Sequence, residues 1–92
     1  MIKSFNHKGL QKFFEFGSVA GIQPAHKQKL RMRLVALSTA TCIEDMNISG
    51  FRLHQLKGKK KGLWAIHVSR NWRMVFKFQD GNAYVVDYED YH

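Results

Sequence analysis

Three histidines in the second half of the chain are the residues best suited to chemistry: His54, His67 and His92. An imidazole titrates near neutral pH, so it can accept or donate a proton during a reaction. Arginine and lysine, which are frequent in the same region, can stabilise an anionic phosphorus centre. Together these side chains suit metal-free cleavage of RNA. In that reaction a 2′-OH loses a proton, the charge of a phosphorane is stabilised and the 5′-oxygen gains a proton.

The last three residues, Asp90, Tyr91 and His92, add polar and aromatic groups to this set. Asp90 can orient or deprotonate an imidazole, Tyr91 can stack on a base or bond a phosphate, and His92 supplies a further ring. Chain ends often fray. Here, however, the predicted sheet runs to about Tyr88, so residues 89–92 should stay close to it and belong to the same site.

A histidine in a strand is more often structural than catalytic, but nearby arginines favour catalytic roles for His54 and His92. A zinc site is the alternative use of these groups, with His54, His67, His92 and Asp90 as ligands. The sequence has no paired ligand spacing of the HxxxH or CxxC kind, and the neighbouring cations would repel a divalent metal. We therefore expect neither a metal nor another cofactor.

Positive charge is concentrated around these histidines. The chain has 15 Lys and Arg against 7 Asp and Glu, a net charge of +8, and no acidic residue lies between Asp45 and Asp80. Such a field favours a polyanionic partner, most often nucleic acid. A merely soluble basic domain, or one that binds an acidic protein, remains an alternative. The basic residues of this stretch are Arg52, Lys57, Lys59, Lys60, Lys61, Arg70, Arg73 and Lys77.

Two helices are predicted ahead of the basic stretch. Leu10, Phe13 and Phe14 recur at helical spacing within residues 8–16, and Gly17 is a typical stop. Pro24 suits the first turn of a second helix, which ends within residues 38–41. Residues 42–48 are expected to add a short helical turn. In the second helix Leu30, Leu34 and Leu37 form the apolar stripe, and Lys27, Lys29, Arg31 and Arg33 take much of the remaining surface.

Alternating residues predict strands in the second half, over 51–56, 63–68, 72–78 and 83–88, and residues 2–5 are a candidate edge strand. Residues 57–62 form a lysine-rich loop, residues 69–71 turn the chain, and Asp80-Gly81-Asn82 is a hairpin signal. Strand alternation then defines two faces. Trp64, Ile66, Val68, Trp72, Met74, Phe76 and Phe78 should pack under the helices, whereas Arg52, His54, His67, Arg73 and Lys77 should lie on the opposite face.

This order of elements predicts a small α+β domain, with a largely antiparallel twisted sheet and two N-terminal helices packed on one face. Its 92 residues fit a single domain spanning 1–92. Cys42 is the only cysteine, so no intramolecular disulfide can form. Residues 1–6 carry no apolar signal core and no run reaches membrane-spanning length, so we expect a cytoplasmic protein without membrane contact.

The face opposite the helices is predicted to bind phosphate. Solvent exposure alone explains polar residues there, but it does not explain the use of one sign of charge throughout. Lys57 lies at the end of a strand, where its position should be well fixed. Lys59, Lys60 and Lys61 lie in a loop, and such a run usually marks a solvated turn.

Four segments, in this order and at this spacing, carry a resemblance to a known family: LHQLKG at 53–58, WAIHV at 64–68, NWRMVF at 71–76 and YEDYH at 88–92. The chain resembles the HigB branch of the RelE-like bacterial toxins over essentially all of its 92 residues. The resemblance implies a ribosome-dependent endonuclease that cuts mRNA in the ribosomal A site, in contact with the 16S rRNA. It implies attack by a ribose 2′-OH, which leaves a 2′,3′-cyclic phosphate and a 5′-OH end.

The resemblance also assigns roles by position. It implies that the catalytic set is His54, Asp90, Tyr91 and His92, with the general base left open among His54, Asp90 and His92. Lys57 and Arg73 are expected to bind phosphate, with Arg70, Lys59 and Lys60 as further RNA contacts, and Asn71 to contact the codon base. The implied partner is a HigA-type helix-turn-helix antitoxin, through which the toxin reaches operator DNA indirectly. A non-catalytic RNA- or ribosome-binding module using the same basic face is the competing hypothesis.

Overall fold

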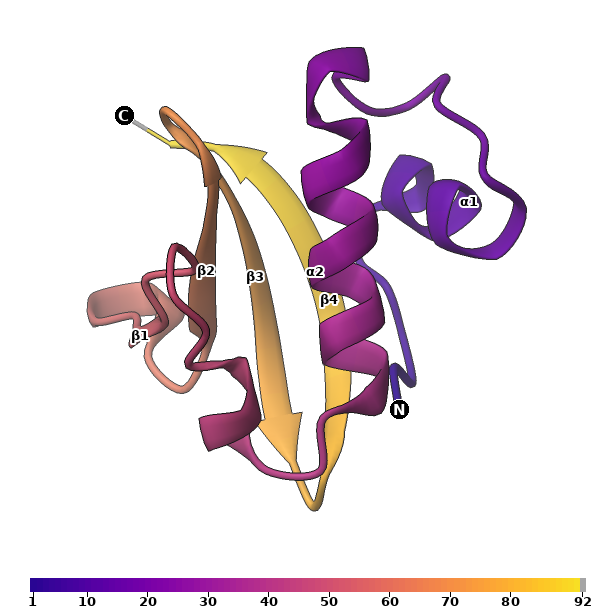
Figure 1. Ribbon diagram of the computed structural model, residues 1–92. Helices are drawn as coiled ribbons and strands as arrows, with labels where there is room; N and C mark the ends of the chain where they lie inside the picture. The colour runs from indigo at the N-terminus through magenta and orange to yellow at the C-terminus, as the bar shows by residue number, and fades with distance from the viewer. Residues whose placement is uncertain (92) are drawn as a thin grey trace.

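The computed structural model describes residues 1–91, and in them two α-helices pack on a four-stranded sheet (Figure 1). The strands follow one another as neighbours in the order β1-β2-β3-β4, and every pair is antiparallel. The predicted α+β class is confirmed. The elements are α1 (Lys8–Phe16), η1 (Pro24–His26), α2 (Lys27–Thr39), η2 (Ile43–Met46), β1 (His54–Gln55), η3 (Gly58–Lys60), β2 (Trp64–Ser69), β3 (Trp72–Gln79) and β4 (Asn82–Asp90).

Both helices begin and end close to the predicted residues. His7 caps α1, because its Nδ1 accepts a hydrogen bond from the Leu10 N–H at 2.9 Å. Gly17 ends α1 in the left-handed conformation, and its N–H donates to the carbonyl of Phe13 at 2.8 Å. Pro24 opens the short helix η1, which leads directly into α2.

No helix within residues 1–91 is long and apolar enough to cross a bilayer.

Arg33 is a correction to the predicted surface of α2. It was expected among the exposed basic residues, but it is buried. It lies three residues after Leu30 and four before Leu37, so it falls on the apolar stripe. Its guanidinium lies 4.5 Å from the ring centroid of Phe51, and its Nε donates to the carbonyl of His67 at 2.7 Å. Arg33 therefore joins α2 to the sheet.

Turns and edges of the sheet also follow the prediction in large part. Asp80 and Gly81 form the two-residue turn between β3 and β4, with φ of 53° and 78°. The N-terminal segment pairs with the free side of β4 through parallel bridges, Ile2 to Ala83 and Phe5 to Val86. Residues 2–5 thus lie at the edge of the sheet, as predicted, and their parallel pairing, which the sequence did not indicate, is the exception in an otherwise antiparallel sheet.

Two strand lengths differ from the prediction. The strand expected over residues 51–56 is reduced to His54–Gln55, because Arg52 has a left-handed φ of 51° that interrupts extended backbone. At the other end of the sheet, β4 continues to Asp90 rather than stopping at Tyr88, since Glu89 and Asp90 pair with β3. Glu89 and Asp90 are therefore strand residues and not part of a tail.

The core lies between the helices and one face of the sheet. Met74 and Phe76 are fully buried there, as strand alternation predicts. Ala65 and Val75 point to the opposite, outer face and are buried as well, so the centre of that face is apolar. The buried core cluster consists of Leu10, Phe13, Ile22, Leu30, Leu34, Leu37, Ala40, Met46, Phe51, Ile66, Val68, Met74, Phe76, Ala83, Val86 and Tyr88.

Candidate active site

The outer face of the sheet, on the side away from α2, carries the candidate site. The strand register sets His67 opposite Arg73, and Arg73 opposite Glu89, so these three residues form one row across β2, β3 and β4. Residues that are direct partners across a sheet share a face. His54 begins the neighbouring row, opposite Ala65. The structure therefore places His54, His67 and Arg73 on the predicted face.

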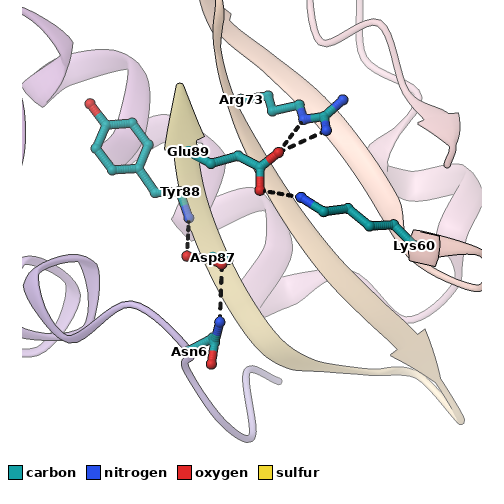
Figure 2. A network of polar contacts seen from close by, with 6 residues as sticks. All are labelled: Asn6, Lys60, Arg73, Asp87, Tyr88 and Glu89. Carbon is teal, nitrogen blue, oxygen red and sulfur yellow. Dashed lines mark hydrogen bonds and ion pairs between the residues drawn. The ribbon is translucent and has the colours of Figure 1, made fainter. Parts of the chain in front are cut away.

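Glu89 is the acceptor at the centre of this face, and sequence reasoning missed it. Its Oε2 accepts hydrogen bonds from Nε and Nη2 of Arg73 at 2.8 Å and 2.7 Å, and its Oε1 accepts one from Nζ of Lys60 at 2.6 Å (Figure 2). Burial alone would raise the pKa of Glu89. The hydrogen bonds from Lys60 and Arg73 and their charges outweigh that effect, so the pKa lies below its usual range.

The predicted use of one sign of charge on this face is therefore wrong. Asp87 and Glu89 alternate with Tyr88 along β4, and both acidic residues lie on the outer face. Figure 2 shows Glu89 and Tyr88 on opposite sides of the strand. The prediction ends the sheet at Tyr88 and so leaves Glu89 out of it. Continuing the strand alternation past Tyr88 would have placed Glu89 beside the cations.

Tyr91 is held against Arg73. The guanidinium carbon of Arg73 lies 4.1 Å from the Tyr91 ring centroid, a cation–π contact. The Tyr91 N–H donates to the carbonyl of Asn71 at 2.8 Å, which ties the residue after β4 to the turn between β2 and β3. One chain of contacts therefore runs from Lys60 through Glu89, Arg73 and Tyr91 to Asn71.

Asp90 lies on the other side of β4. It pairs with Trp72, and strand alternation places its side chain on the face of Trp72 and Tyr88 rather than on that of Glu89. Burial raises the pKa of Tyr88, and the charge of Asp90 adds to the effect. Which imidazole Asp90 would act on is not specified by the prediction, and His92 lies outside the described residues. The roles of Asp90 and His92 in proton transfer therefore stay predictions.

His54 is exposed at β1 and has a defined hydrogen bond. Its Nδ1 lies 2.8 Å from the carbonyl oxygen of Arg52. A carbonyl can only accept, so in the neutral ring Nδ1 carries the proton and Nε2 is left with a lone pair. This tautomer is the one that a general base acting through Nε2 requires.

His67 has a different environment. Burial lowers its pKa, and the charges of Arg52, Arg33 and Lys29 lower it further. It therefore remains neutral to a lower pH than an exposed histidine.

The lysine loop divides into two parts. Lys57 lines an open pocket of about 320 Å³ at the end of β1, together with residues that include Leu56, Lys61 and Gly62. Lys60 instead points to Glu89 and is anchored. Lys59 is exposed, as is Arg70, which adopts a left-handed φ of 52° in the turn before Asn71. Lys59 and Arg70 thus lie at the margin of the site.

A buried aromatic cluster supports the site from the helix side, and sequence reasoning did not identify it. His26 Nδ1 and the Tyr88 hydroxyl lie 2.6 Å apart, and the Trp72 and Tyr88 ring centroids are 4.6 Å apart. Burial, followed by the charge of Lys29, lowers the pKa of His26. The cluster fixes the end of β4 to the start of α2, directly behind Arg73 and Glu89.

This arrangement can bind a phosphate and move a proton. Arg73 supplies a positioned guanidinium, the lysines of residues 57–60 supply further charge, and His54 supplies a proton acceptor. Across residues 1–91, no group of three or more His, Cys, Asp or Glu side chains is arranged to hold a metal ion.

Comparison with known proteins identifies related chains of similar length. Endoribonuclease HigB of Proteus vulgaris is 47% identical over 92 residues and is covered completely, as is this chain. Toxin HigB-1 of Vibrio cholerae is 31% identical over 85 residues, with 90% of each chain covered.

Solved structures with the same fold are more distant in sequence. YafQ of Escherichia coli superposes with a TM-score of 0.54 at 17% identity, over 92% of this chain and 86% of that one. Protein HP0894 of Helicobacter pylori gives a TM-score of 0.51 at 20% identity, over 96% and 94%. The family model for the RelE-like toxin HigB of type II toxin–antitoxin systems matches residues 3–92. The chain therefore belongs to the HigB-like family of RelE-like toxins.

Proposed function

We propose that this toxin is a metal-independent endoribonuclease that enters the ribosomal A site and cleaves the mRNA bound there, thereby inhibiting translation. The observation that carries the proposal is the Arg73 guanidinium, held between Glu89 and Tyr91 on the outer face of the sheet, with His54 on the same face. Its full-length relative from Proteus vulgaris bears the name endoribonuclease.

The proposed reaction is a transesterification within the RNA. A general base removes the proton of a ribose 2′-OH, the 2′-oxygen forms a bond to the adjacent phosphorus, and the bond to the 5′-oxygen breaks. A general acid protonates that leaving oxygen. The products are a 2′,3′-cyclic phosphate and a 5′-OH end. His54, Asp90 and His92 are the candidates for the proton transfers, and the tautomer of His54 favours it as a base.

The remaining residues bind the RNA in this proposal. Arg73 and Lys57 hold the scissile phosphate, and Arg73 stabilises the charge that develops on it. Tyr91 stacks on a base, and Asn71 contacts the codon base from the turn between β2 and β3. Arg70 and Lys59 contribute charge around these groups, and Lys60 adds only what its ion pair with Glu89 leaves.

A type II toxin has an antitoxin partner. We propose that this antitoxin is of the HigA type, with a helix-turn-helix through which the toxin reaches operator DNA indirectly. The other partners are the ribosome, with its A site and 16S rRNA, and the mRNA. We propose that the activity is cytoplasmic, because the proposed partners, ribosome and mRNA, meet there.

Mapping of mRNA 3′ ends after brief expression in growing bacteria tests the proposal. We expect in-frame cuts at translated codons. Cuts in untranslated RNA would exclude dependence on the ribosome.

The variant His92→Gln distinguishes a nuclease from a binding module. A nuclease should lose cleavage and retain ribosome binding, whereas a module that only binds should be unaffected. Lys12→Ala, on the exposed surface of α1, is a control variant outside the site and should leave cleavage unchanged.

A further inference from the structure

The ion pairs of Glu89 have a consequence for the reaction. Side-chain exposure is 15% for Arg73 and 21% for Glu89, so the pair is largely shielded from water. Shielding strengthens a charged hydrogen bond, and the bond lengths of 2.6–2.8 Å are those of strong charge-assisted contacts. Arg73 and Lys60 are both candidates for binding RNA phosphate, yet here each is bound to a carboxylate of the same chain.

The geometry of Arg73 determines which of its N–H groups face Glu89. A guanidinium carries five N–H donors in a rigid plane. Glu89 engages the edge formed by Nε and Nη2, and the Tyr91 ring lies against the guanidinium at 4.1 Å. One edge and the stacked ring together define the orientation of the plane. The second edge, formed by Nη1 and Nη2, is the fork that can hold a phosphate through two hydrogen bonds.

Lys60 connects a second element to the same carboxylate. It lies in η3, within the lysine loop, and 29 residues separate it from Glu89 along the chain. The contact fixes the loop against the sheet. It also uses a positive charge that would otherwise be available to RNA.

We propose that Glu89 is a positioning residue for the nuclease reaction, which orients Arg73 toward the scissile phosphate while it withholds Lys60 from RNA. This inference rests on the proposed function and adds a residue to it. Glu89 raises the rate through the placement of Arg73 and weakens ground-state binding through its charge. Its removal should therefore slow the bound reaction and tighten RNA binding at the same time.

The test compares Glu89→Ala and Glu89→Gln with wild type in single-turnover cleavage of mRNA on programmed ribosomes, over a range of toxin concentrations. Glu15→Gln on α1 is the control, since Glu15 is an exposed carboxylate outside the site. We expect the saturating rate of Glu89→Ala to fall about 10- to 100-fold, as for a misplaced catalytic group. Glu89→Gln keeps an acceptor oxygen and should retain an intermediate rate.

RNA binding distinguishes a positioning role of Glu89 from a purely structural one, because a variant that is only less stable should not bind RNA more tightly. The half-saturating toxin concentration should fall in both Glu89 variants. Binding to a short single-stranded RNA should also become more sensitive to salt. A plot of the logarithm of the binding constant against the logarithm of the salt concentration should steepen by about 0.7 in both variants, because Lys60 is released to contact phosphate. Circular dichroism melts identify a temperature at which all variants are folded.

The outcomes separate this inference from the proposed function. A wild type that does not cleave would overturn the function. If wild type cleaves, a saturating rate of Glu89→Ala equal to that of wild type would overturn the inference. A parallel loss of rate and of RNA affinity would overturn it too.

Discussion

At the scale of single residues, Arg73 shows how a side chain can be partly buried and still suit a reaction. Its charge is balanced by Glu89, one side is covered by Tyr91, and only 15% of the side chain is exposed. A guanidinium fits this environment because it is planar and can stack and bond through an edge at once. An ammonium group has neither property.

Arg73→Lys therefore tests geometry at constant charge. We expect the cleavage rate to fall about 100-fold, because lysine cannot hold a phosphate through a fork. The free energy of unfolding should fall by only about 1 kcal/mol, since lysine can keep one contact to Glu89. Single-turnover cleavage and urea unfolding measure the two effects. Lys12→Arg, the reverse exchange on α1, is the control, and an Arg73→Lys variant as fast as wild type would contradict the assigned role.

At the scale of elements, β4 is the strand that organises the site. Its outer side presents Glu89, and its inner side presents Tyr88 to His26 at the start of α2. Trp72 of β3 lies against both of these rings, with its ring centroid 4.6 Å from Tyr88 and 5.6 Å from His26. The position of Glu89 relative to Arg73 thus depends on packing on the opposite face of the same strand.

The His26 contact predicts a pH dependence of stability. Its pKa in the fold lies below the ordinary value of 6.5, so between these two values the unfolded chain binds more protons than the folded one. Stability from this residue is complete above pH 6.5 and is lost as pH falls from 6.5 through the folded pKa. Urea unfolding between about pH 8 and about pH 5 should show the decline.

His26→Phe should be less stable than wild type at the upper pH, because Tyr88 loses its partner, and should lose less stability on acidification. His67 has a lowered pKa as well and contributes a decline of the same sign, so the dependence is reduced and not abolished. A decline as steep in His26→Phe as in wild type would exclude His26 as a source.

At the scale of the whole molecule, the net charge of +8 is larger than the charge available to RNA at the site. Asp87 and Glu89 lie on the outer face itself, and Lys60 and Arg73 are paired with Glu89. Many of the other cations belong to α1 and α2, on the opposite side of the sheet. Net charge therefore describes long-range attraction, whereas the local arrangement determines which cations touch phosphate.

Salt dependence separates these two contributions. In binding to a short single-stranded RNA, we expect Lys57→Ala and Arg70→Ala each to reduce the log–log salt slope by about 0.7. Lys12→Ala removes the same charge from α1 and should leave the slope unchanged. Equal reductions in all three variants would mean that the RNA responds to net charge alone and that the outer face is not the binding surface.

Local pattern was sufficient to predict much of the fold and the face on which several candidate site residues lie. The bounds of α1 and the turn at Asp80-Gly81 depend on neighbours within a few residues, so the sequence determines them directly. Strand alternation likewise indicates that Met74 and Phe76 face the core, where both are buried. The placement of His54 and Arg73 on one face follows from strand alternation. Resemblance to the toxin family named the remaining site residues.

Only the tertiary structure decided how these residues are connected. The contacts of Glu89 reach 16 residues back to Arg73 and 29 back to Lys60, and they exist because strand register and the path of the lysine loop bring those groups together. The burial of Arg33 depends on Phe51 and the His67 carbonyl in the same way. The spacing of residues along a strand specifies which face of the sheet each side chain occupies. Which side chains meet across neighbouring strands depends on the length of each strand and on the register between them. For that reason the positions of His54, His67 and Arg73 on the outer face were predictable from the sequence, and the carboxylate that holds Arg73 and Lys60 was not.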